Sequence, residues 1–155
     1  MKLRKFKPED IDQVTNLFYD TVHSVNAADY DETQRQAWAP HRSPKDREKA
    51  LKRFLENIVY VVEQDGKIIG FGDMSKTGYL DRMFTHKDYQ RQGVAALIYA
   101  QLEQDARALG LKEITSEVSI TAKSAAEQGG FIVAKAQDKE HNGVVFRNYV
   151  MKKEL

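Results

Sequence analysis

The segment from Asp88 to Leu97, DYQRQGVAAL, places two side-chain amides, an arginine and one glycine directly before an apolar-periodic run. If a helix begins near Gly93, its first main-chain N–H groups lack partners within the helix and point outward. The helix dipole adds about half a positive charge there, so a phosphate would satisfy several N–H groups at once. Gly93 would let the main chain approach a ligand, Ala95 keeps the next turn small, and Arg91 could add charge at the rim. The pattern predicts an anion-binding turn, with an ordinary loop as the alternative.

Several other chemistries are excluded or disfavoured by the residue types. The lysine and glycine spacing of a Walker loop are missing, and one glycine does not make the dinucleotide-binding pattern. The chain has no cysteine, which excludes disulfides, thiol catalysis and thiolate metal sites. Its four histidines show no metal-ligand spacing, so no metal is expected.

The elements expected around this turn are strands mixed with helices. Apolar alternation and turn residues predict strands at residues 2–6, 58–63, 67–74, 79–85, 112–119, 131–137 and 144–151. Helical spacing predicts helices within residues 7–25, 26–40, 43–57, 93–109 and 121–128. The pairs Asp65-Gly66 and Asn142-Gly143 mark hairpin turns. Together these elements predict an α/β sandwich with a mixed sheet.

Length and composition favour an ordinary globular chain. The 155 residues suit a single domain spanning residues 1–155, with 41% hydrophobic and 30% charged residues. A net charge of +1 gives no broad basic face, so no nucleic-acid partner is expected. No apolar run approaches the roughly 20 residues of a membrane span, and the N-terminus MKLRKFKPED lacks an apolar signal core. We therefore expect a cytoplasmic protein with no membrane partner.

The turn also resembles a known motif. QRQGVA, following the strand LDRMFT, is similar to motif A of the GNAT superfamily of N-acetyltransferases, which reads Gln or Arg, two residues, Gly, one residue, then Gly or Ala. Gln90, Gly93 and Ala95 match it, and GGF at residues 129–131 and the order of elements resemble the family across nearly the whole chain. The resemblance implies an α/β (α+β) fold with a mixed, mostly antiparallel central sheet of about seven strands flanked by four to five helices.

The resemblance also implies acetyl-CoA as co-substrate. In the family, main-chain N–H groups of this turn hold the pyrophosphate, which maps here onto Gln90, Arg91, Gln92, Gly93, Val94, Ala95 and Ala96. Met83, Phe84 and Thr85 would pair with the pantetheine arm as an added strand would. A main-chain N–H of the same strand could hydrogen-bond the thioester oxygen. Ser119 stands where relatives often place an asparagine that contacts the cofactor.

Acetyl transfer to an amine needs a group that removes a proton, because a lysine-like amine has a pKa of about 10.4 in water. Asp81, which alternation places on one strand face with Tyr79 and Met83, is the first candidate base, and Glu117 is the second. Relatives often protonate the leaving thiolate with a tyrosine whose position is Ala126 here. Tyr149, on the last strand, is the candidate replacement. Each of the three could instead be an ordinary surface or packing residue.

The acceptor pocket should include the irregular segment after the first helix. His23, Tyr30 and Trp38 are candidate substrate-binding residues, and His41 lies in the same segment; aromatic rings there could hold an amine by cation–π contact. The leading function is acetyl transfer from acetyl-CoA to a primary amine of a small molecule or peptide, by direct attack in a ternary complex. A catalytically weak acyl-CoA-binding module is the alternative, and a homodimer remains possible.

Overall fold

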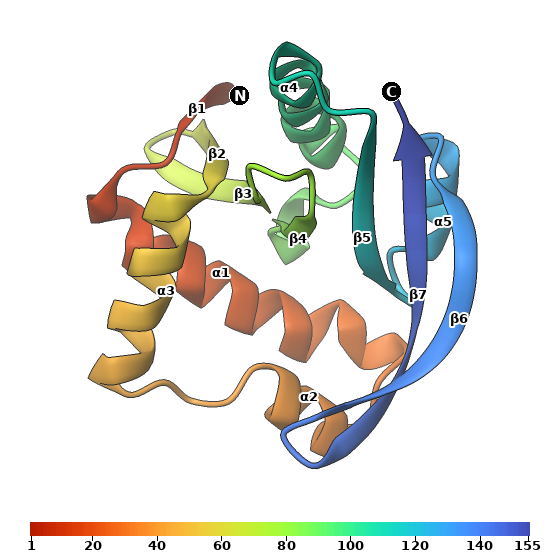
Figure 1. Cartoon of the computed structure of the whole chain (residues 1–155). Helices are drawn as coiled ribbons and strands as arrows, with labels where there is room; N and C mark the ends of the chain where they lie inside the picture. Colours follow the sequence, from red (N-terminus) through yellow and green to blue (C-terminus); the bar gives the residue numbers. More distant parts are fainter.

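Seven strands and five helices build the chain (Figure 1), and the computed structural model describes residues 1–155. The strands are β1 (Lys2–Lys5), β2 (Ile58–Gln64), β3 (Lys67–Met74), β4 (Leu80–Thr85), β5 (Glu113–Ser119), β6 (Ile132–His141) and β7 (Val144–Glu154). The helices are α1 (Ile11–Ser24), α2 (Glu32–Trp38), α3 (Pro44–Glu56), α4 (Val94–Ala108) and α5 (Lys123–Gln128). Short 3₁₀ turns lie at Pro8–Asp10, Asn26–Ala28 and Lys87–Tyr89.

The strands form two antiparallel sheets with the orders β1-β2-β3-β4 and β5-β7-β6. The sheets meet only where β4 begins: Tyr79 and Thr115 form a single parallel bridge, and the Ser116 hydroxyl donates to the Leu80 carbonyl at 2.7 Å. Beyond that point β5 pairs with β7 and does not continue along β4 (Figure 1). The expected mixed, mostly antiparallel arrangement is confirmed, and the seven strands are divided at the β4–β5 boundary.

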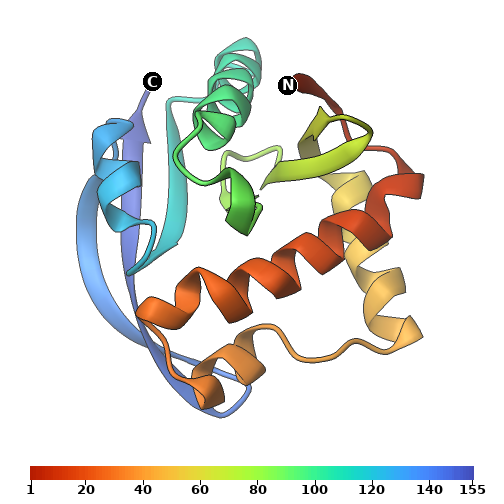
Figure 2. The ribbon, with the colours of Figure 1, turned by 180° about the vertical axis from the view of Figure 1, so that it is seen from behind.

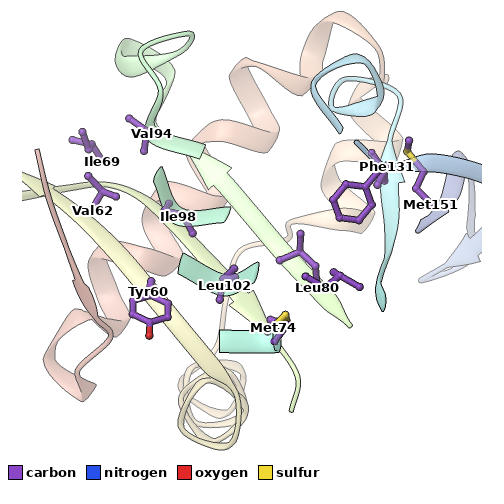
Figure 3. Close-up of a cluster of buried hydrophobic side chains, with 13 residues drawn as sticks. Tyr60, Val62, Ile69, Met74, Leu80, Val94, Ile98, Leu102, Phe131 and Met151 are labelled. Carbon is purple, nitrogen blue, oxygen red and sulfur yellow. The ribbon is translucent and has the colours of Figure 1, made fainter. Parts of the chain in front are cut away.

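Two hydrophobic cores cover the faces of the first sheet. One core packs α4 on the sheet through Val94, Ile98 and Leu102 (Figure 3), and it continues to Phe131 and Met151 of the second half of the chain. The other core joins α1 and α3 to the opposite face. Figure 2 shows α4 and α1 on different sides of the strands, seen from behind. The layers are therefore α4, the sheet, and then α1 with α3.

Glycines in β3 let α4 approach the sheet closely. A Cβ built on Gly70 would lie 2.4 Å from a Val94 methyl carbon, and one on Gly72 would lie 2.5 Å from an Ile98 methyl carbon. Real Cβ atoms do not tolerate such distances, so any side chain there would push the helix away. The position of the first turn of α4 therefore depends on these two residues.

Local signals in the sequence account for most element boundaries. Ser43 caps α3 and accepts a hydrogen bond from the Asp46 main chain, with Pro44 at the first helical position. The Asp65-Gly66 and Asn142-Gly143 turns have positive φ at both residues, as hairpins of this type require. None of the helices has the length and apolar character needed to cross a membrane.

Candidate active site

The inner edge of β4, beyond Leu80, carries main-chain groups that face away from β3. The His86 N–H donates to the Ile69 carbonyl at 2.8 Å, and bonded and non-bonded pairs alternate along an antiparallel ladder. Counting back from that pair, Phe84 is also bonded to β3, whereas Met83 directs its N–H and C=O groups to the β5 side, and Thr85 directs its N–H there. The Thr85 carbonyl is already engaged by side chains. Two of the three predicted pairing residues thus present main-chain groups at the open edge. Phe84 does not, and its ring packs on the α1 side instead.

The turn after β4 is held in place by Gln90. Its side-chain amide donates to the Thr85 carbonyl at 2.7 Å, and the Thr21 hydroxyl on α1 donates to the same carbonyl at 3.2 Å. Arg91 follows in a left-handed conformation with φ of 59° and is exposed. The Gln90 side chain therefore stabilises the turn, and Arg91 is an exposed cation at the rim of the turn.

The first turn of α4 has no side-chain cap. Gly93 is the N-cap residue, with φ of 83°, and no side chain bonds to the main chain there. A Cβ built on Gly93 would meet no atom within 4 Å, so the space over the helix end is open. The N–H groups of Val94, Ala95 and Ala96 begin the helix and lack intrahelical partners. The end of the β4 edge thus has open N–H groups, which are what an anion site would need.

A β-bulge changes the direction of the β4 side chains. Met74 pairs with Leu80 while Asp73 pairs with Arg82, so Asp81 is the extra residue. Met83 packs against the α4 core, whereas Asp81 lies 3.7 Å from the Arg53 guanidinium on α3. The prediction that Asp81 shares a face with Met83 was wrong, because the bulge interrupts the strand alternation. Asp81 faces the α1 and α3 side.

Both candidate bases act electrostatically on Tyr79, beside the bridge that joins the sheets. Burial, and then the charges of Glu117 and Asp81, raise the pKa of the Tyr79 phenol to about 12. The Glu117 carboxylate forms an ion pair with Lys139 at 2.6 Å, a much shorter contact than that of Asp81 with Arg53. The two carboxylates thus flank the point where β4 and β5 separate, and Asp81 is the less tightly paired of the two.

A third carboxyl group, Asp73, is fully buried under the bulge. Burial raises its pKa from 3.8 to about 6, opposed by a hydrogen bond from Asn57, with Asp81 adding repulsion. Its second carboxylate oxygen has no hydrogen-bond partner. Because the folded state favours the protonated form, Asp73 stabilises the fold at low pH, and that contribution is lost as pH rises through about 6.

Replacing Asp73 with asparagine should therefore change stability in a pH-dependent way. The variant stays neutral, so its free energy of unfolding relative to the wild type should increase between pH 4 and pH 8 by up to about 3 kcal/mol. Denaturant unfolding across that range measures the difference. Asp138→Asn, at an exposed carboxylate, is the control for losing one negative charge. A stability difference independent of pH would contradict a raised pKa at Asp73.

Three other predicted residues lie on the β5 and β7 half of the chain. Tyr149 pairs in register with Val118, and the Lys123 ammonium lies 5.0 Å from the centre of its ring. Ser119 ends β5, and its hydroxyl accepts a hydrogen bond from the Ala122 N–H at 3.2 Å. Ala126 lies on α5 against the α4 core and offers no hydroxyl. Tyr149 thus makes packing contacts, and Ser119 stabilises a turn. The catalytic role of Tyr149 and the cofactor contact of Ser119 stay predictions.

A pocket of about 440 Å³ opens on the α1 and α3 side of β4. Trp38 lines it, together with Phe18 and Tyr19 of α1. Tyr30 does not: it is 4% exposed, donates to the Arg147 carbonyl and accepts from the Ile120 N–H. That bridge joins the segment before α2 to the second sheet, a contact across 117 residues. Tyr30 therefore holds the fold together and does not line this pocket.

The two histidines of this segment also lie beside the pocket and not in its wall. The His23 Nε2 atom contacts the Ala39 carbonyl at 2.8 Å, and its ring packs on Tyr19. His41 contacts the Tyr19 hydroxyl at 3.2 Å and lines a neighbouring surface hollow. No group of three or more potential metal ligands occurs in the structure.

Sequence reasoning missed the cations of the pocket, which are Arg42, Lys49, Arg53 and Arg82. Arg82 lies in the middle of β4 on the same face as Phe84, and alternation alone did not show that this face lines a pocket. Arg53 lies on α3 among other charged residues, and Arg42 lies in the loop before that helix. The only signal in the sequence was the unusual presence of arginine in the middle of a half-buried strand.

The architecture, the open β4 edge and the uncapped α4 turn together define the GNAT acetyltransferase class. The GNAT acetyltransferase domain family matches residues 26–154, so the chain belongs to the GNAT superfamily of N-acetyltransferases. The uncharacterized N-acetyltransferase YafP of Escherichia coli (strain K12) is 29% identical over 152 residues, covering 98% of this chain and 95% of its own.

Solved structures agree with this family. A GCN5-related N-acetyltransferase from Rhodopseudomonas palustris superimposes with a TM-score of 0.93 at 26% identity, over 99% of this chain and 95% of that one. PaiA N-acetyltransferase from Thermoplasma acidophilum, in complex with coenzyme A, has a TM-score of 0.80 at 18% identity, over 99% of this chain and 98% of that one. YncA from Salmonella typhimurium, with its cofactor acetyl-CoA, has a TM-score of 0.75 at 16% identity, over 100% of this chain and 94% of that one. The last two support the fold.

Proposed function

We propose that residues 1–155 form one acetyltransferase domain that moves the acetyl group of acetyl-CoA to a primary amine of a small molecule or peptide. The observation that supports this most is the continuity of the open edge at Met83 and Thr85 with the uncapped first turn of α4. The edge offers donors and acceptors to the amide groups of a pantetheine arm. The helix end offers N–H groups to a diphosphate.

The residues that would hold the cofactor fit the group. The N–H groups of Gly93, Val94, Ala95 and Ala96 would bind the pyrophosphate, because the space over Gly93 is open and no side chain caps the helix. Arg91 and Gln92 are exposed at the rim of the same turn. Acetyl-CoA, when bound, supplies a thioester whose carbonyl carbon accepts the amine.

We propose direct attack in a ternary complex, with the amine approaching from the pocket side. Asp81 takes the proton of the ammonium, directly or through water, so that the nitrogen lone pair becomes available. The Met83 N–H, at the open edge, would donate to the carbonyl oxygen as negative charge develops there. The carbon–nitrogen bond would form and the carbon–sulfur bond would break, with coenzyme A leaving as the thiolate of a thiol whose pKa is near 8.5. The nitrogen would then lose its second proton to water, and that proton would replace the one given to the sulfur. Tyr149 is the candidate donor of a proton to that sulfur.

The alternative, an acyl-CoA-binding module with weak catalysis, rests on Ala126, which offers no hydroxyl at its position on α5. A general acid typically raises the reaction rate by about 10²–10⁴-fold, so a protein without one could bind acetyl-CoA and turn it over very slowly. The chain would then hold acetyl-CoA at the same helix end.

Release of the coenzyme A thiol distinguishes an acetyltransferase from a binding module, and no thiol of the protein interferes with the assay. Because the chain has no cysteine, a colorimetric thiol reagent reports only free coenzyme A. We expect amine-dependent thiol release from acetyl-CoA with at least one class of primary amine. Tight binding of coenzyme A with no release above the solution rate, over a broad amine panel, would contradict the enzyme and favour the module.

A further inference from the structure

The pocket beside β4 combines positive charge with an aromatic wall. Its cations are Arg42, Lys49, Arg53 and Arg82, and Asp46 is its one acid. The Asp46 carboxylate is already held by the Ser43 N–H and hydroxyl as part of the α3 cap. The positive charge of the lining is therefore not balanced from within the pocket.

Arg82 is the cation most firmly set into the pocket. Its guanidinium lies 5.0 Å from the ring centre of Phe18 and 5.9 Å from that of Phe54. No hydrogen bond or ion pair to another side chain engages it, although a guanidinium carries five N–H donors. Burial, with the neighbouring Arg53, lowers its pKa to about 10, so it still carries its charge at neutral pH. Two aromatic rings thus orient a charged fork whose donors remain free.

Arg53 and Arg42 extend the same charge toward the mouth of the pocket. The Arg53 guanidinium lies 3.7 Å from the Asp81 carboxylate, which is a loose ion pair. The buried Nε–H of Arg53 has no hydrogen-bond partner. Arg42 lies in the loop between α2 and α3, and burial lowers its pKa while Asp12 and Asp46 oppose that shift. Planar guanidinium groups bind carboxylates and phosphates through paired hydrogen bonds.

We propose that the acceptor is a small amine that also carries an oxyanion, a carboxylate or a phosphate, bound by Arg82 with help from Arg42 and Arg53. The inference rests on the proposed function, since it assigns the acceptor of that reaction. Phe18, Tyr19 and Trp38 would pack against an apolar part of the same molecule. Asp81, next to Arg82 in β4, then lies close to the amine end, so the charges of the acceptor match those of the site.

Binding can be followed independently of turnover because Trp38 is the one tryptophan in the chain and it lines the pocket. The change in Trp38 fluorescence would be measured in two comparisons. Leucine would be compared with leucinamide and isopentylamine, which lack the carboxylate. O-phosphoethanolamine would be compared with ethanolamine, which lacks the phosphate. We expect at least one amine that carries an oxyanion to bind about 10-fold or more tightly than its partner that lacks the oxyanion. The leucine and phosphoethanolamine arms distinguish a carboxylate from a phosphate.

Arg82→Gln should remove that preference and leave coenzyme A affinity within about 2-fold of wild type. Arg42→Gln, in an exposed loop, should reduce the preference without affecting the core. If Arg82→Gln fails to fold, the loss of preference in Arg42→Gln is the test of the anion pocket. Arg107→Gln, an arginine near the end of α4 paired with Glu103, is the control that loses one charge elsewhere. The preference should survive in that control.

Two failures can be told apart. If amines with and without an oxyanion change Trp38 fluorescence at the same concentrations, or the preference survives both Arg82→Gln and Arg42→Gln, the inference is overturned whatever the turnover. If amines with an oxyanion bind selectively but none releases thiol from acetyl-CoA, the anion pocket stands and the proposed enzymatic function fails.

Discussion

Replacing Gly93 with alanine will weaken coenzyme A binding by about 10-fold or more. The added Cβ lies over the end of α4, in the open space where the N–H groups of Val94 and Ala95 would meet the pyrophosphate. The left-handed φ of 83° also adds a strain of about 1–2 kcal/mol to the folded state. Isothermal titration calorimetry measures the affinity, and thermal unfolding measures the strain.

Gly110→Ala is a matched control for that experiment. Gly110 follows the opposite end of α4, has φ of 76° and also has no atom within 4 Å of a built Cβ. The two variants should lose similar stability, and only Gly93→Ala should lose affinity. Equal affinity in both, within error, would show that the helix end does not bind the diphosphate.

Replacing Asp81 with asparagine will lower kcat/KM by about 10²-fold or more. The bulge directs this carboxylate to the pocket side, and its contact with Arg53 is loose, so it is available to accept the proton of the amine. Glu117→Gln should have a smaller effect, because the Glu117 carboxylate is held by Lys139 at 2.6 Å. Asp138→Asn, at a strand carboxylate paired with Arg147, is the surface control.

Coenzyme A affinity must be retained in these carboxylate variants for the comparison to report on the proton transfer. Thiol release at saturating acetyl-CoA, over a range of amine concentrations, gives the two kinetic constants separately. If Glu117→Gln loses activity and Asp81→Asn keeps it, the assignment of the base is reversed. If both keep full activity, neither carboxylate removes the proton.

Residues whose conformation depends on near neighbours were predictable from the sequence. Gly93 before an apolar helix and the Asp65-Gly66 turn each act within a few residues, and the structure has both as expected. The order of these local signals was enough to indicate the architecture and the family. The turn that follows β4 could therefore be located before any tertiary contact was known.

Residues whose role depends on distant contacts were not predictable in the same way. The hydroxyl of Tyr30 bonds to the main chain of Arg147, and no local pattern reports that contact. The bulge at Asp81 is set by pairing with β3, so alternation within β4 gave the wrong face for this residue. Arg82, on the Phe84 face of β4, meets Arg42 and Arg53 only through tertiary packing, which is why the acceptor pocket looked aromatic in sequence and is cationic in structure.

The most direct test of the central claim is a crystal structure of the protein with coenzyme A bound. The account predicts the pyrophosphate within hydrogen-bond distance of the N–H groups of residues 93–96, and the pantetheine arm paired with Met83 and Thr85. The sulfur should then lie near the point where β4 and β5 separate. Coenzyme A bound elsewhere, with the first turn of α4 facing only solvent, would contradict it.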